Sequence, residues 1–107
     1  MTEDYAAIEP TRAEVDALPG ATLLEFGSPF CGHCMRAQAL LAEALQAHAP
    51  LRHLKIADAR GRRLGRSFTV KLWPTLIFLR DGVEVARVVR PQDAAAIAEG
   101  LARVTSL

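Results

Sequence analysis

The stretch LLEFGSPFCGHC, residues 23–34, contains both cysteines of the chain, Cys31 and Cys34. Residues 23–27 are apolar except for Glu25, and such an apolar run is typical of a buried strand. The Ala- and Leu-rich segment 34–49 that follows predicts a long helix. The two cysteines therefore lie between a buried strand and the start of a helix.

This position of the cysteine pair predicts redox chemistry. The first turn of a helix has free N–H groups and a partial positive charge, which together stabilise a thiolate. The thiolate is the attacking species in disulfide exchange. We therefore predict that Cys31 is the attacking nucleophile. Cys34, one turn further along and expected to be more buried, is predicted to be the resolving thiol.

The rest of the chain alternates between strand-like and helix-like patterns. Thr11 and Glu14 have the spacing of a capping box, which predicts a short helix that ends at Leu18. Two β-rich runs flank Asp81-Gly82, a type I′ hairpin signature, so these strands should be antiparallel neighbours. The other predicted strands are 5–8 (at an edge), 22–26 and 51–57, and the other helices are one that ends near Phe68 and one from Gln92 to Val104.

This order of elements predicts an α/β fold in a single domain, residues 1–107. The early βαβ part favours parallel strands with right-handed crossovers, and the hairpin adds antiparallel strands. We therefore expect a three-layer α/β/α arrangement with a central mixed β-sheet.

Composition and charge argue against several other classes of protein. Half of the 107 residues are hydrophobic and the net charge is +1, which gives no general attraction to nucleic acid or to a membrane surface. No apolar run approaches about 18 residues, so no membrane-spanning helix is expected. The N-terminal sequence is acidic and lacks the pattern of a signal peptide, which predicts a cytoplasmic protein.

Two segments resemble the thioredoxin superfamily. LLEFGSPFCGHC is similar to the strand and active-site turn of that family, and FTVKLWPTLIFLRDGVEV, residues 68–85, is similar to its cis-proline loop and hairpin. The similarity covers nearly the whole chain. The Cys-Gly-His-Cys variant resembles protein disulfide isomerase domains more than ordinary thioredoxin, which has proline in the place of His33. The resemblance implies a thioredoxin fold and thiol–disulfide oxidoreductase activity.

The resemblance also implies roles for individual residues. Cys31 and Cys34 match the redox pair of the family. Pro74 matches its cis-proline, where it would present the backbone of Trp73 to an extended substrate. Glu25 matches the buried carboxylate that relays a proton to the resolving thiol. A lone carboxylate in an apolar strand should resist ionisation, so we expect the pKa of Glu25 to be raised.

Residues near the pair are expected to shape the substrate-binding surface. Phe30 offers an apolar flank for a partner polypeptide, and Gly32 lets another backbone come near. Trp73 and Arg90 stand where the family has a smaller β-branched residue and a glycine, so partner choice should differ from that of ordinary thioredoxin. Further departures are Gly27, Ala39 and Leu54, in the places of an aromatic residue, a helix-kinking proline and a lysine that accompanies the buried acid.

His33, between the cysteines, is predicted to stabilise the Cys31 thiolate. It can donate a hydrogen bond to the thiolate or carry charge near it, and either effect favours the dithiol and makes the disulfide a stronger oxidant. We therefore predict a redox potential above the value of about −270 mV that is typical of thioredoxin. In the alternative interpretation, His33 only fills a solvent-exposed position.

Two alternatives to an oxidoreductase follow from other residues. A zinc site needs four ligands, and we expect His48 and His53 to lie away from the cysteine pair. The second alternative is a partner-binding or chaperone-like module of the same fold, with redox activity secondary. Its docking face would combine Trp73, Arg90 and the basic run Arg60, Arg62, Arg63 and Arg66.

The predicted partners follow from the oxidoreductase interpretation. Protein disulfides or thiols are the expected substrates, and a thioredoxin reductase or glutathione is the expected electron donor. We expect no cofactor, no metal, no nucleic acid and no membrane to take part, and we expect a monomer. The direction of electron flow does not follow from the sequence, because reduction, oxidation and isomerisation use the same residues.

Overall fold

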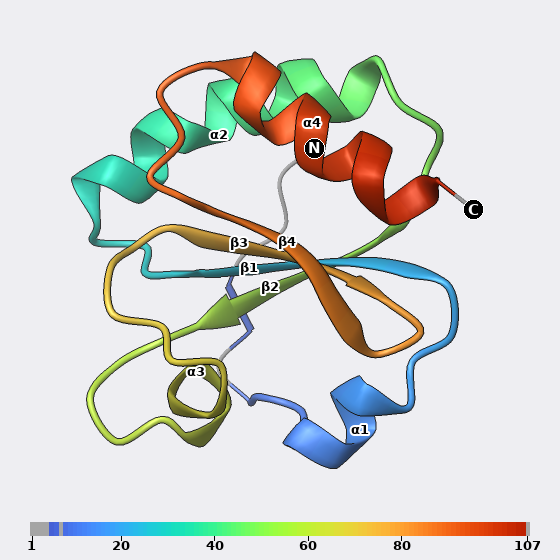
Figure 1. Ribbon diagram of the computed structural model, residues 1–107. Coiled ribbons are helices and arrows are strands. Elements are labelled where there is room, and N and C mark those ends of the chain that lie inside the picture. Colours follow the sequence, from blue (N-terminus) through green and yellow to red (C-terminus); the bar gives the residue numbers. More distant parts are fainter. Residues whose placement is uncertain (1–4, 7, 107) are drawn as a thin grey trace.

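The computed structural model of the chain describes residues 5, 6 and 8–106 (Figure 1). Its centre is a four-stranded sheet with the strand order β2-β1-β3-β4. β1 pairs in parallel with β2 and antiparallel with β3, and β3 pairs antiparallel with β4. The sheet is therefore mixed, as predicted. The strands are β1 (Ala21–Gly27), β2 (Arg52–Ala57), β3 (Thr75–Arg80) and β4 (Val83–Val89).

Helices cover both faces of the sheet. Figure 1 shows α2 and α4 on one side of the strands and α1 and α3 on the other, which confirms the three-layer fold. The element boundaries differ from the predicted ones by a few residues. The helices are α1 (Arg12–Asp16), α2 (Gly32–Gln46), α3 (Arg63–Ser67) and α4 (Ala94–Thr105).

β1 is buried on both faces and separates two hydrophobic clusters. Leu24 and Phe26 belong to the cluster that includes residues of α1 and α3, whereas Leu23 belongs to the cluster with residues of α2 and α4. Successive side chains of a strand point to opposite faces. Glu25, two residues after Leu23, therefore points toward the layer of α2, which begins with the cysteines.

The hairpin between β3 and β4 has the predicted turn. Asp81 and Gly82 both have positive φ values, 51° and 81°, as a type I′ turn requires. The Asp81 carboxylate also accepts a hydrogen bond from the backbone N–H of Gly20 at 2.7 Å. This contact ties the hairpin to the residue just before β1.

An edge strand was predicted at residues 5–8, of which residue 7 lies outside the described residues. For residues 5, 6 and 8 the prediction is wrong, because they form no strand. Ala6 forms an isolated parallel bridge with Ile56 at the free edge of β2. Two backbone hydrogen bonds make the bridge, one from Ala6 to Lys55 at 2.8 Å and one from Ala57 to Ala6 at 3.2 Å. The segment touches the sheet at one point, and this contact places Tyr5 beside β1 and β2.

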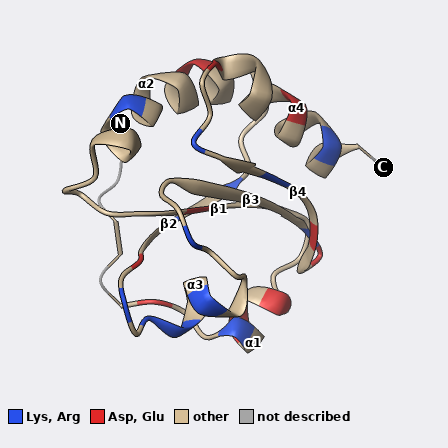
Figure 2. Ribbon diagram, turned by 60° about the vertical axis from the view of Figure 1, so that its left-hand side comes forward, with Lys and Arg blue, Asp and Glu red and all other residues tan. Residues whose placement is uncertain are grey.

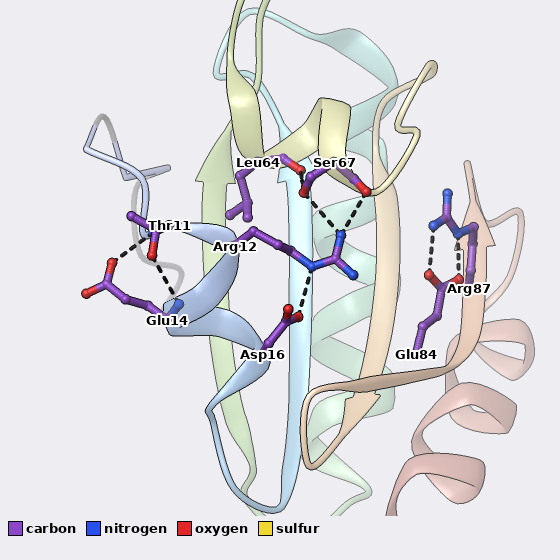
Figure 3. Close-up of polar contacts among 8 residues, drawn as sticks. All are labelled: Thr11, Arg12, Glu14, Asp16, Leu64, Ser67, Glu84 and Arg87. Atoms are coloured by element: carbon purple, nitrogen blue, oxygen red, sulfur yellow. Dashed lines mark hydrogen bonds and ion pairs between the residues drawn. The ribbon is translucent and has the colours of Figure 1, made fainter.

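α1 is fixed at its start and along its length (Figure 3). The predicted capping box is present, because Thr11 and Glu14 each accept a backbone hydrogen bond from the other. Arg12 donates to the backbone carbonyl of Ser67 at 2.7 Å, and its guanidinium lies 3.7 Å from the centroid of the Phe68 ring. These contacts join α1 to α3 in one layer.

Candidate active site

Cys31 is the N-cap residue of α2. Its Sγ accepts a hydrogen bond from the backbone N–H of Cys34 at 3.1 Å. That N–H is one of the four that the start of a helix leaves without a partner inside the helix. Cys31 is partly exposed and Cys34 is buried, and both are free thiols. The helix start therefore presents one accessible sulfur and hides the second beside it.

Burial changes the pKa of the second thiol, Cys34, from that of an exposed cysteine. It raises the pKa of Cys34 to about 11, and the interaction between the Cys34 and Cys31 side chains contributes in the same direction. Cys34 therefore keeps its proton at neutral pH. To act as a nucleophile, it must pass that proton to another group.

The carboxylate of Glu25, on β1, is completely buried. Its Oε2 accepts hydrogen bonds from the hydroxyl of Tyr5 and from Nε2 of Gln38, each at 2.8 Å. Its Oε1 lies 2.8 Å from Nε2 of His53. Three donors, from the N-terminal segment, α2 and β2, therefore surround this side chain.

The prediction of a raised pKa for Glu25 is wrong. Burial alone would raise the pKa, but the hydrogen bonds with His53, Gln38 and Tyr5 and the charge of Lys55 lower it below its ordinary value. Glu25 lies in an apolar strand, yet the groups that reach it from other elements are polar. The carboxylate is therefore ionised at neutral pH.

We expected Leu54 to replace the lysine that accompanies the buried acid in the family. This expectation is also wrong. Lys55, one position further, is the residue that pairs with Glu25 in the register of β1 and β2. It is 8% exposed, and its Nζ donates to Oε1 of Gln38 at 3.1 Å. Gln38 in turn donates to Glu25. A lysine therefore does accompany the buried acid, through the Gln38 amide.

The Trp73–Pro74 peptide bond is cis, as the resemblance implied. The carbonyl oxygen of Trp73 lies 3.9 Å from Sγ of Cys31 and accepts a hydrogen bond from the thiol. The indole Nε1 of Trp73 donates to Asp58 at 2.8 Å. The structure therefore brings the backbone of Trp73 next to the accessible cysteine and turns its ring toward the loop after β2.

Arg90 covers the same carbonyl group. Its Nε donates to the carbonyl oxygen of Trp73 at 2.8 Å, and its backbone N–H donates to the carbonyl of Pro74 at 3.0 Å. The φ angle of Arg90 is +50°, in the left-handed region that favours glycine. The expected glycine of the family suits this backbone, and arginine adds a cation beside Cys31.

His33 is exposed, and its Nδ1 accepts a hydrogen bond from Arg36 at 2.8 Å. The charge of Arg90 is the main cause that lowers the pKa of His33, and loss of hydration and the charge of Arg36 add to it. The imidazole is therefore neutral at pH 7. His33 was predicted to stabilise the Cys31 thiolate either by a hydrogen bond or by a positive charge. A neutral imidazole can do so only by donating a hydrogen bond from Nε2–H.

The other predicted surface residues are accessible. The Phe30 side chain is 94% exposed, so it is not part of the core. A Cβ added to Gly32 would meet only Arg36, at 3.8 Å. Met35 in the first turn of α2 and Leu72 just before Trp73 are 67% and 48% exposed. Apolar surface therefore flanks the cysteines and the Trp73 loop.

The remaining candidates lie elsewhere. His48 contacts the carbonyl of Ala49 and the Thr105 hydroxyl, whereas His53 contacts Glu25. Within residues 5, 6 and 8–106, no group of three or more His, Cys, Asp or Glu side chains is placed to hold a metal ion. The basic run lies on α3 and the loop before it (Figure 2), in the layer opposite α2.

Sequence reasoning missed three members of the site. Gln38 lies four residues after Cys34 in α2, so helical spacing could have placed it on the same face. His53 lies two residues before Lys55 in β2, and only the register of β1 and β2 brings it to Glu25. Tyr5 reaches the site through a single bridge at the sheet edge, which no local pattern signals.

The thioredoxin family model matches residues 9–103 of the chain. The chain belongs to the thioredoxin family. Thioredoxin 2 from Pseudomonas aeruginosa PAO1, in its reduced form, is 54% identical; the match covers 98% of this chain and 97% of that one, with a TM-score of 0.88. A single-site mutant of the thioredoxin from Halobacterium salinarum NRC-1 is 26% identical over 88% and 82% of the two chains, with a TM-score of 0.72.

A relative of a different size shares this domain. Protein disulfide-isomerase A2 from Homo sapiens is 38% identical over 92 residues, which are 78% of this chain and 17% of that protein. The chain thus spans only a small part of the curated relatives it matches. The predicted fold and superfamily are confirmed, and the chain forms a thiol–disulfide oxidoreductase domain with a Cys-x-x-Cys pair. The alternative of a partner-binding module is not favoured.

Proposed function

We propose that this protein exchanges disulfides with protein partners through Cys31 and Cys34. One observation supports this most strongly: a partly exposed sulfur caps α2 and accepts the N–H of Cys34, while the second thiol lies buried beside it. An accessible attacking sulfur with a neighbouring resolving sulfur is the arrangement that two-step exchange requires.

In the reducing direction, the Cys31 thiolate attacks one sulfur of a substrate disulfide. A bond forms between Cys31 and that sulfur, and the other substrate sulfur leaves as a thiolate and takes up a proton. Cys34 then loses its proton and attacks Sγ of Cys31, which releases the second substrate thiol. Two electrons have passed to the substrate, and the protein holds a Cys31–Cys34 disulfide.

Glu25 is the proposed acceptor of the Cys34 proton. It is buried near this thiol and ionised at neutral pH, so it has a free place for a proton. His33 is proposed to favour the dithiol by donating from Nε2 toward the Cys31 sulfur. Both roles rest on the resemblance to the family and on the positions of these side chains.

The proposed substrate is an extended protein segment that binds beside the Trp73–Pro74 loop. Phe30 and Gly32 would flank the segment on the side of α2. Because Arg90 donates to the Trp73 carbonyl, its guanidinium competes with a substrate strand for this acceptor. We propose that Arg90 therefore selects among partners, with acidic segments favoured by its charge.

The oligomeric state, the location and the electron donor are further parts of the proposal. We propose that the protein acts as a monomer in the cytoplasm and receives electrons from a thioredoxin reductase or from glutathione. Light scattering of the purified protein tests the oligomeric state. Assays with each donor in turn test the source of electrons. Among the described helices, none is long and apolar enough to span a membrane.

The reduction of a peptide with one disulfide, with dithiothreitol as electron source, tests the proposal. The wild-type protein should accelerate the reaction. Cys31→Ser should remove the acceleration, because no attacking sulfur remains. Cys34→Ser is the matched control, since it keeps the same substitution chemistry but should still perform the first attack. Catalysis by Cys31→Ser at the wild-type rate would overturn the proposal.

A further inference from the structure

The side chain of Tyr5 lies between Glu25 and Cys34. Its hydroxyl donates to Oε2 of Glu25 at 2.8 Å. A Cβ added to Gly27 would lie 2.8 Å from the Tyr5 oxygen and 2.8 Å from Sγ of Cys34. Both atoms therefore pack against Gly27, where any larger residue would collide with them. The Tyr5 hydroxyl and the Cys34 thiol also influence the pKa of one another.

His53 connects Glu25 with the surface. Its Nε2 lies 2.8 Å from Oε1 of Glu25, the oxygen on the opposite side from Tyr5. The side chain of His53 is 25% exposed, whereas that of Glu25 is not exposed at all. The ring of His53 has two nitrogens, one of which can accept a proton while the other releases one. A continuous series of contacts therefore runs from the buried thiol to solvent.

We propose that Tyr5 and His53 complete a proton path in which Tyr5 links Cys34 to Glu25 and His53 links Glu25 to solvent. The proposal extends the proposed function, because it assumes that Cys34 is the resolving thiol and that Glu25 receives its proton.

The transfer balances at each atom. The Cys34 S–H proton moves to the Tyr5 oxygen while the Tyr5 O–H proton moves to Oε2 of Glu25, so that Tyr5 is unchanged afterwards. Cys34 is left as a thiolate and attacks Sγ of Cys31, and the leaving substrate thiolate carries the electron pair of the broken bond. The carboxyl O–H of Glu25 then turns to His53, whose ring, in the tautomer with its hydrogen on Nδ1, accepts the proton on Nε2 and releases the Nδ1 proton to solvent, so that Glu25 is ionised again. Burial, the main cause, and the nearby Glu25 raise the pKa of Tyr5 far above neutral, so the phenol exchanges protons and does not stay ionised.

The properties of Glu25 explain why an outlet is needed. The hydrogen bonds that keep Glu25 ionised also disfavour its protonated form, so the proton needs a route by which to leave. Gln38 and Lys55 face Glu25 from α2 and β2, but neither is a route out. The Gln38 amide does not titrate, and a Lys55 ammonium has no lone pair to accept a proton. His53 has a ring nitrogen that can accept a proton, and its side chain is partly exposed.

Two substitutions isolate the two links. Tyr5→Phe removes the hydroxyl and keeps the ring that lies 4.4 Å from the Lys55 ammonium. His53→Gln keeps an amide donor for Glu25 but cannot carry a proton. The reduced variants are mixed with a disulfide peptide, quenched in acid after set times, and the mixed disulfide is followed by mass spectrometry. This measurement gives separate rates for attack by Cys31 and for resolution by Cys34.

The expected result differs between the two steps. Attack by Cys31 should stay within about twofold of wild type in both variants. At pH 7, resolution should slow at least about tenfold in Tyr5→Phe, less than the roughly 10²–10⁴-fold that a general acid–base group typically contributes, and by a smaller factor in His53→Gln. Near pH 11, where Cys34 ionises without help, the deficit of Tyr5→Phe should disappear. A merely structural role of the hydroxyl would not be rescued by pH.

Resolution at the wild-type rate in Tyr5→Phe at pH 7, or a deficit that persists unchanged near pH 11, would overturn the role of Tyr5. A wild-type resolution rate in His53→Gln would overturn the outlet. The Cys34→Ser variant separates these failures from that of the proposed function. If Cys34→Ser accumulates the mixed disulfide, the two-step reaction stands whatever the relay variants show; if it does not, the proposed function itself fails.

Discussion

Glu25 is kept ionised inside the protein by its neighbours, and this has a measurable consequence for stability. The hydrogen bonds from Tyr5, Gln38 and His53 favour the carboxylate over the carboxylic acid in the folded protein only. A group whose pKa is lower in the folded state than in the unfolded state binds its proton more readily on unfolding. It therefore stabilises the fold above its unfolded pKa.

We predict that the free energy of unfolding falls as the pH drops through and below the unfolded pKa of Glu25, near 4.5. Glu25→Gln should be less stable than wild type at pH 7 by about 1–3 kcal/mol, because its amide N–H₂ faces donors. The difference between the two proteins should shrink toward pH 3. Urea unfolding between pH 3 and pH 7 measures this. A difference that stays constant over the whole range would contradict the account of Glu25.

Arg90 acts on a second titratable residue. Its positive charge disfavours the imidazolium form of His33, so Arg90→Gly should raise the pKa of His33 toward the usual value of 6.5. Arg90→Lys keeps a cation at this position and serves as the matched control. NMR titration of the His33 ring protons gives both values. If Arg90→Gly and Arg90→Lys shift the pKa equally, the charge of Arg90 is not the cause.

His33 should also set the redox potential. We predict that the wild-type couple lies above about −270 mV, and that His33→Ala lowers the potential by roughly 30 mV for each tenfold loss of dithiol preference. Equilibration with glutathione buffers, read by mass spectrometry of the two redox forms, measures both proteins. A wild-type value at or below that of thioredoxin would remove the predicted role of His33.

At the level of elements, α4 packs closely on β3 at Gly100. A Cβ at this position would collide with the ring of Phe78, which is fully buried. Alanine is the better helix former by about 1 kcal/mol, so propensity and packing act in opposite directions here. We predict that packing prevails and that Gly100→Ala destabilises the protein by about 1–3 kcal/mol.

Ala98→Gly provides the control within the same helix. Ala98 is exposed, so this change should cost only the difference in propensity, about 1 kcal/mol. Urea unfolding of both variants measures the two free energies. If Gly100→Ala stabilises the protein by the amount that Ala98→Gly costs, the close approach of α4 to Phe78 does not limit residue 100.

Local sequence signals predicted the elements that depend on neighbours in the chain. The Asp81-Gly82 turn, the capping box at Thr11 and the helix after the cysteines each depend on residues within a few positions. The single contact of Ala6 with Ile56 depends on a partner far along the chain, and the expected strand 5–8 was wrong there. The wrong expectation for the lysine beside Glu25 also depends on a distant partner, because the register of β1 and β2 decides whether Leu54 or Lys55 faces Glu25.

At the scale of the whole molecule, the site is an assembly of distant segments. The redox pair begins α2, Glu25 lies on β1, His53 lies on β2 and Tyr5 reaches them from the N-terminal segment. The cysteines and Glu25 lie within one short stretch, and their sequence predicted them. The groups that set the pKa of Glu25 come together only in the folded sheet, so its direction could not be predicted.

The measurement that tests the central claim most directly is trapping with the Cys34→Ser variant. Incubated in reduced form with a disulfide-bridged peptide, this variant should accumulate one mixed disulfide, and proteolytic mapping should locate the bond at Cys31. Dithiothreitol should release the peptide. If no mixed disulfide forms, or if the peptide is attached anywhere other than Cys31, the two-step exchange through Cys31 and Cys34 is wrong.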